Sequence, residues 1–177
     1  MKPTESFNLL VTFTGHKTPE SGEELIGIEE IEIALEDQKD LFDIKETEFY
    51  NVALIQSDSD PKDTARRLRD ASTTVISKIV PVEMVIRTRK DSIVEKVISL
   101  SRDKIKANET FIVRGDIRGR SHIESKEELL SDITQEITEK LLVEKEEDYP
   151  DWVVQIEVVG ENTGISILRP EDIIKKD

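Results

Sequence analysis

A group of basic residues in the middle of this sequence is suited to one kind of chemistry, the binding of phosphate groups. Residues 87–126 carry eleven Lys or Arg against six Asp or Glu, a net charge of +5, whereas the whole chain has a formal charge of −14. The candidate phosphate-binding residues are Arg87, Arg89, Lys90, Arg114, Arg118, Arg120 and Lys126. Screening limits a remote charge to about 8–10 Å at physiological salt, so the acidic remainder does not exclude a local phosphate site. Charge alone equally fits a solvated basic loop on an acidic protein.

The spacing of these residues favours positions at the ends of secondary structure. Arg87, Arg89 and Lys90 precede Ser92-Ile-Val-Glu95, a capping box that predicts a helix start. The cationic side chains and the positive end of the helix could therefore bind the same phosphate group.

A predicted strand over 110–117 and the segment after it carry the remaining basic residues. Arg114 alternates with apolar residues in this strand, so its side chain should leave the core face. Gly115 and Gly119 would let the backbone of a ligand approach closely. Arg118 and Arg120 follow, and Ser121, His122 and Lys126 continue toward the next helix.

No catalytic or metal site is indicated. The chain has no cysteine, which excludes disulfides, thiolate metal sites and a cysteine nucleophile. The two histidines, His16 and His122, have no ligand spacing, and the many carboxylates favour no particular pair. Thr14-Gly-His-Lys17 lacks the phosphate-binding fingerprints and is interpreted as a turn. We therefore expect no catalytic residue, no metal and no cofactor.

The first half of the chain predicts a ferredoxin-like domain. Strands are expected over 7–13, 42–48 and 50–56, with a further partly extended stretch over 75–87. One helix is expected from Thr18, with Pro19 in its first turn, to about Glu36, and another from Asp60-Pro61. The order strand, helix, strand, strand, helix, strand is that of a four-stranded antiparallel sheet with two helices on one face.

The second half predicts a further α+β domain. Helices should begin at Ser92 and at Ser125, where capping boxes precede apolar residues at helical spacing. Strands are expected over 110–117, 151–159 and 165–168, with a turn over 160–164. The predicted division is residues 1–80, residues 81–170 and a polar tail over 171–177. Residues 169–177 are expected to be peripheral. The fold class is α+β.

The chain shows no sign of a membrane segment. Met1–Phe7 lacks an apolar signal core, and no apolar run approaches the roughly 18 residues that a membrane span needs. We therefore expect a cytoplasmic protein that does not contact a membrane.

Three stretches resemble an archaeal THUMP domain: Ile79–Thr88, Glu109–Arg114 and Val154–Leu168. The most specific residues are Glu157-Val-Val-Gly160 and Thr163-Gly-Ile-Ser166. The ferredoxin-like first half agrees, because THUMP domains commonly follow such a domain. The resemblance extends over roughly residues 5 to 168.

The resemblance implies tRNA binding, with the paired domains holding the acceptor end. Many THUMP proteins add a methyltransferase, thiouridine synthetase, pseudouridine synthase or deaminase domain, and none is expected here because the chain ends after the THUMP-like hairpin. The stand-alone build is similar to the THUMP adaptors that assist tRNA acetylation, which implies a non-catalytic protein and a separate acetyltransferase that makes 4-acetylcytidine. The ligand surface of the family then corresponds to Arg87, Arg114, Arg118, Arg120 and Lys126.

Two alternatives remain open from the residues themselves. One is a small hydrolase or nucleotide-processing enzyme that uses carboxylates near His122. The other is an acidic protein–protein scaffold whose acidic helices dock a basic partner.

Overall fold

A computed structural model of the chain describes residues 3–14, 22–36 and 41–176. These residues form two compact units. The N-terminal unit consists of residues 6–82 together with 172–176, and the C-terminal unit consists of residues 3–5 together with 83–171.

The N-terminal unit is a ferredoxin-like domain, as the sequence predicts. Its elements are β1 (Leu9–Phe13), α1 (Glu23–Leu35), β2 (Phe42–Glu46), β3 (Val52–Ser57), α2 (Pro61–Asp70), β4 (Ile76–Pro81) and β10 (Ile174–Lys175). The sheet order is β10-β4-β1-β3-β2, and all neighbours are antiparallel. Strand residues such as Leu9 and Val11 share a buried cluster with Ile31 of α1 and Leu68 of α2.

The two helices of this unit begin differently. The side chain of Asp60 accepts a hydrogen bond from the Lys62 amide at 2.8 Å, and Pro61 occupies the first helical position, which confirms the predicted start of α2. The cap predicted for α1, Thr18-Pro19, lies outside the described residues. The described part of α1 begins after Gly22, whose φ of 77° is readily available to glycine.

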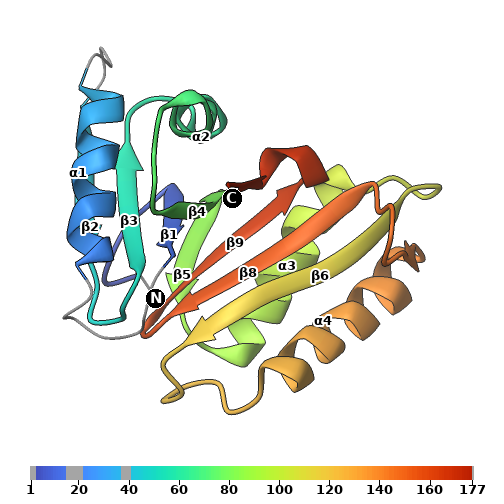
Figure 1. Cartoon of the computed structure of the whole chain (residues 1–177). Helices are drawn as coiled ribbons and strands as arrows, with labels where there is room; N and C mark the ends of the chain where they lie inside the picture. Colours follow the sequence, from blue (N-terminus) through green and yellow to red (C-terminus); the bar gives the residue numbers. More distant parts are fainter. Residues whose placement is uncertain (1–2, 15–21, 37–40, 177) are drawn as a thin grey trace. The chain divides into compact units, whose positions relative to one another are not determined.

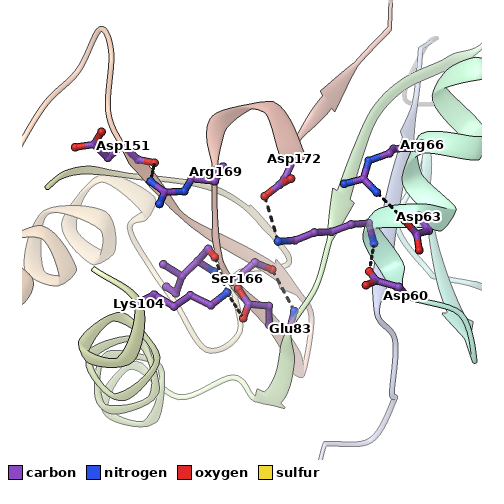
Figure 2. A network of polar contacts seen from close by, with 11 residues as sticks. Asp60, Asp63, Arg66, Glu83, Lys104, Asp151, Ser166, Arg169 and Asp172 are labelled. Carbon is purple, nitrogen blue, oxygen red and sulfur yellow. Dashed lines mark hydrogen bonds and ion pairs between the residues drawn. The ribbon is translucent and has the colours of Figure 1, made fainter. Parts of the chain in front are cut away.

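The prediction of a peripheral tail is wrong for its described part, because residues 172–176 are attached to the N-terminal unit. Ile174 pairs with Ile79 as part of β10 and is only 6% exposed. Lys176 Nζ donates to the carbonyls of Leu68 and Ala71 at 2.8 and 2.9 Å, so it caps the C-terminal end of α2, and burial lowers the pKa of this lysine. Asp172 completes the attachment through an ion pair with Lys62 Nζ at 3.3 Å (Figure 2).

The C-terminal unit has a mixed sheet whose one face is covered by two helices (Figure 1). Its elements are β5 (Met84–Arg87), α3 (Lys90–Lys104), β6 (Thr110–Arg118), α4 (Lys126–Leu141), β7 (Glu144–Lys145), β8 (Trp152–Val159) and β9 (Asn162–Leu168). The 3-10 helix η1 (Pro170–Asp172) follows, and its last residue already belongs to the N-terminal unit. The strand order is β5-β9-β8-β6-β7, with β6 parallel to β7 and β8. Phe111 and Ile156 of the sheet share a buried cluster with Ile93 of α3 and Ile133 of α4.

The start of this unit is held by the side chain of Glu83. Its Oε1 accepts the Ile167 amide at 2.6 Å and its Oε2 accepts Lys104 Nζ at 2.6 Å, while the Glu83 amide donates to Ser166 Oγ (Figure 2). The carboxylate thereby links the entry of β5 to β9 and to the end of α3.

Two element starts differ from the prediction. Helix α3 begins at Lys90 rather than at Ser92, because the Ile93 amide already donates to the Arg89 carbonyl at 2.9 Å. Strand β9 begins at Asn162 rather than at Ile165, because residues 162–164 pair with both β8 and β5. The turn is therefore only Gly160-Glu161, and Gly160 has a φ of 60°. No described helix is long and apolar enough to cross a membrane.

Candidate nucleic-acid interface

Six of the seven predicted basic residues gather at one end of the C-terminal unit. They are Arg87 at the end of β5, Arg89 and Lys90 at the start of α3, Arg118 at the end of β6, Arg120 in the following loop, and Lys126 at the start of α4. The strand register brings these residues together, because Arg87 lies opposite Asn162 and Arg118 lies opposite Val159. The ends of β5 and β6 thus lie on either side of the β8–β9 turn (Figure 1).

Backbone hydrogen bonds fix this end of the sheet. The Gly160 amide donates to the Arg118 carbonyl at 2.8 Å, and the Thr88 amide donates to the Glu161 carbonyl at 2.8 Å. The hydroxyls of Thr88 and Thr163 also share a buried hydrogen bond at 2.8 Å. Arg87 and Arg118 therefore lie at strand ends that are fixed to the β8–β9 turn, whereas Arg120 lies in the loop after β6.

A small hollow of about 180 Å³ lies between the start of α3 and the start of α4. Lys90, His122 and Glu128 are among the residues that line it. Ser125, which also lines it, accepts the Glu128 amide at 3.1 Å, so this serine is the N-cap of α4 as predicted. Because Glu127 and Glu128 occupy the first turn of α4, the positive end of that helix is already compensated by carboxylates.

Acidic neighbours compensate several of the gathered cations. Arg87 pairs with Glu161 at 3.6 Å, and Lys126 pairs with Asp116 at 3.7 Å. Lys90 Nζ lies 2.5 Å from Asp132 and 3.5 Å from Glu128, and the hydrogen bond that Lys90 donates to Asp132 raises the pKa of Lys90. Arg89 and Arg120 are exposed, and within residues 3–14, 22–36 and 41–176 neither forms an ion pair.

Arg118 differs from the others because its charge is used inside the fold. Its Nη1 lies 2.8 Å from Glu157 Oε2, and the side chains of Arg118 and Glu157 are 16% and 1% exposed. Gln155 Nε2 donates to the other carboxylate oxygen of Glu157 at 2.9 Å. The arginine thus neutralises a buried carboxylate on the sheet face away from the helices.

Arg114 lies apart from the gathered residues. It is exposed on the face away from the helices, which confirms the alternation predicted for β6. It lies four positions before Arg118, which is about 13 Å along a strand. Its Nη2 lies 3.4 Å from the Glu147 carbonyl, in a segment that also contains Glu144, Glu146 and Asp148.

The two glycines of this segment serve the fold of the chain. A Cβ at Gly115 would meet the Ile156 carbonyl oxygen at 2.0 Å, so the missing side chain allows β6 to approach β8 rather than admitting a ligand. Gly119 has a φ of 84°, which lets the chain turn out of β6.

The carboxylates that surround the cations were not predicted from the sequence. Asp116, Glu128, Asp132 and Glu157 come from three different elements, and only Glu128 had a signal of its own, as the last residue of the capping box. His122 is exposed, and the described part of the chain shows no hydrogen bond between it and a carboxylate. Among the described residues no group of His, Cys, Asp and Glu could hold a metal ion.

Residues 87–168 match the family model of the THUMP domain. This part of the chain is a THUMP domain. It is preceded here by the ferredoxin-like domain formed by the N-terminal unit. None of the curated protein sequences matches the chain.

Several solved structures share this two-domain fold. PH1313 from Pyrococcus horikoshii Ot3 has a TM-score of 0.74 at 17% identity, and the match covers 96% of this chain and 55% of that one. A 4-thiouridine synthetase, solved as an RNA complex with bound ATP, has a TM-score of 0.65 at 13% identity, covering 96% and 42%. TrmN from Thermus thermophilus has a TM-score of 0.56 at 14% identity, covering 92% and 46%. The chain thus spans about half the length of these proteins, and the likeness concerns the THUMP domain with its preceding domain.

Proposed function

We propose that this chain binds tRNA through the basic end of its THUMP domain and acts as a non-catalytic adaptor for a tRNA-modifying enzyme. The observation that carries the proposal is the gathering of six cationic residues at one end of the sheet, with Arg89 and Arg120 exposed and unpaired among the described residues. This choice of ligand is supported by the solved structure of a 4-thiouridine synthetase with the same fold, which is an RNA complex.

Recognition would rest on phosphates rather than on bases. The aromatic residue of the basic segment, Phe111, is fully buried in the core and offers no stacking surface. Arginine side chains at strand and helix ends suit phosphate oxygens, and such contacts position a nucleic acid without reading its sequence. Arg89 and Arg120 would make the first contacts, and Arg87, Lys90 and Lys126 would join by exchanging a carboxylate for a phosphate.

The modification served by the adaptor is proposed to be cytidine acetylation, carried out by a separate acetyltransferase. The support is the build of the chain, in which a ferredoxin-like half precedes stretches such as Val154–Leu168 that resemble a THUMP domain, because this build is similar to that of the acetylation adaptors. An adaptor role also agrees with the chemistry at the basic end, where the polar side chains of Ser125, Glu128 and Lys90 are engaged with one another or with the backbone.

A titration of tRNA across salt concentrations tests the binding. The affinity of the wild-type protein should fall steeply with salt, because each phosphate contact releases counterions. The double variant Arg89→Ala plus Arg120→Ala should bind about tenfold more weakly and show a shallower salt dependence.

The matched control is Arg66→Ala plus Arg69→Ala, which removes the same charge from exposed residues of α2. It should change binding much less. Salt-independent binding, or equal losses in the two double variants, would show that the basic end is not the RNA site.

The acetylation role has a separate test. Nucleoside mass spectrometry of tRNA from cells that lack this protein should show loss of 4-acetylcytidine, restored by the wild-type chain and not by the Arg89→Ala plus Arg120→Ala variant. Unchanged 4-acetylcytidine would refute the acetylation role and leave the tRNA-binding measurement standing.

A further inference from the structure

The outer side of α1 is apolar and acidic at the same time. Leu25, Ile26 and Ile33 are 71%, 47% and 59% exposed, three of the seven large hydrophobic side chains that are exposed among the described residues. The helix contains five glutamates and no Lys or Arg. Exposed apolar residues gathered on one element of a folded protein mark interaction surfaces more often than isolated ones do.

Helical geometry places these residues together. At about 100° per residue, the exposed side chains fall within an arc of about 120°. This outer face of α1 consists of Leu25, Ile26, Glu29, Glu32, Ile33 and Glu36. Apolar and acidic side chains are therefore interspersed on the same surface, along a helix about 20 Å long.

The opposite side of α1 already supplies the contacts that the fold needs. Gly27, Ile31 and Leu35 are buried, and Gly27 lies so close to the ring of Phe13 that even a Cβ would clash. The exposed Leu25, Ile26 and Ile33 are therefore additional to the core. They cost solubility and add nothing to the described core cluster of this unit.

We infer that the outer face of α1 is a docking surface for a partner protein whose binding segment is an amphipathic helix with apolar and basic residues. The apolar residues of such a segment would cover Leu25, Ile26 and Ile33, and its Lys or Arg side chains would lie among Glu29, Glu32 and Glu36. RNA is disfavoured on this face by the carboxylates. A second copy of the chain is disfavoured as well, because two such faces would bring like charges together.

The inference goes beyond RNA binding and does not depend on it. The basic end belongs to the C-terminal unit and the outer face of α1 belongs to the N-terminal unit, so the two surfaces carry opposite charge on different units. An adaptor must contact both a nucleic acid and an enzyme, and this face provides the second kind of contact.

A synthetic amphipathic peptide with Leu and Lys on one face is the probe, and a peptide with Glu in place of Lys is its control. Fluorescence anisotropy with the full chain should show binding of the basic peptide, weakened at least about tenfold by Leu25→Ser plus Ile33→Ser. The variant Glu29→Gln plus Glu32→Gln should weaken binding and reduce its dependence on salt.

Matched controls come from other exposed positions of the chain. Leu142→Ser plus Tyr149→Ser removes two hydrophobic side chains that are 80% and 88% exposed, and Glu144→Gln plus Glu147→Gln removes two exposed carboxylates. Both controls should leave peptide binding unchanged. Equal losses in the control variants, or no preference for the basic peptide over the acidic one, would overturn the inference.

Two further measurements separate the remaining occupants. Sedimentation at several protein concentrations would overturn the inference if it showed a dimer that Ile33→Ser disrupts, since a second copy would then cover the face. Binding of tRNA by Leu25→Ser plus Ile33→Ser should equal that of the wild type. Loss of tRNA binding in this variant would make the face part of the RNA site and overturn the inference. Unchanged tRNA binding by Arg89→Ala plus Arg120→Ala would instead refute the RNA proposal alone.

Discussion

Arg118 and Arg120 are two residues apart in the sequence and have opposite surroundings. Arg118 is nearly buried against Glu157, whereas Arg120 is exposed. Their different positions follow from where β6 ends, since Arg118 is still in register with β8 and Arg120 is past the turn at Gly119. The same residue type therefore supports the fold at one position and remains available to a ligand at the other.

The substitution Arg118→Ala should lower the free energy of unfolding by about 3–5 kcal/mol, because it removes the ion-pair partner of a buried carboxylate. Urea unfolding followed by circular dichroism measures this change. Arg120→Ala is the control and should stay within about 0.5 kcal/mol of the wild type. Equal stabilities for the two variants would show that the Arg118–Glu157 pair contributes little to the fold.

The sequence could predict the exposure of a residue but not its partners. The alternation of β6 was enough to place Arg114 away from the core. The pair of Arg118 with Glu157 spans 39 positions of the chain and depends on the register between β6 and β8, which no local pattern contains. For the same reason, the candidate cations were found and the carboxylates that compensate them were not.

At the scale of the element, two capping boxes with the same Ser-x-x-Glu pattern lie at different positions relative to their helices. Ser125 caps α4 through its side chain, whereas Ser92 lies inside the first turn of α3. Thr88 is fixed to Glu161 and Thr163 of the neighbouring hairpin, and α3 starts two residues later, at Lys90. A tertiary contact therefore set the start of α3 and overrode the local signal.

Ser125→Ala should destabilise the protein by about 1 kcal/mol, because the Glu128 amide loses its acceptor at the helix start. Ser92→Ala should have almost no effect, since alanine is favoured inside a helix and the Ser92 side chain does not cap α3. Thermal or urea unfolding of the two variants, measured side by side, tests the difference. A larger loss of stability for Ser92→Ala than for Ser125→Ala would instead indicate that Ser92 caps α3, as the sequence predicted.

At the scale of the whole molecule, the chain crosses between its two units more often than the sequence indicated. Residues 3–5 belong to the C-terminal unit, residues 6–82 to the N-terminal one, and residues 172–176 return to the N-terminal one. The order of strands and helices was enough to predict the ferredoxin-like domain. Strand β10 was not predicted, because a two-residue strand in a polar segment has no detectable hydrophobic periodicity.

Ile174→Ala should destabilise the N-terminal unit by about 2 kcal/mol, because it leaves a cavity beside Ile79 of β4. Lys175→Ala, at the exposed neighbouring position, is the control and should be nearly neutral. Trp152, the only tryptophan of the chain, lies in the C-terminal unit, so its fluorescence reports that unit while circular dichroism reports both. A destabilisation equal in the two signals would mean that the units unfold together.

The place of β10 in the chain has a consequence for synthesis. Most of the N-terminal sheet leaves the ribosome first, and domains generally fold in that order. Its edge at β4 nevertheless stays open until residue 174 has been made, after every strand of the other sheet. An unpaired strand edge is a place for incorrect pairing with another chain. A polypeptide that is interrupted within the THUMP domain therefore has two incomplete sheets. The C-terminal sheet lacks the strands that were not made, and the N-terminal sheet lacks β10 and exposes the edge of β4.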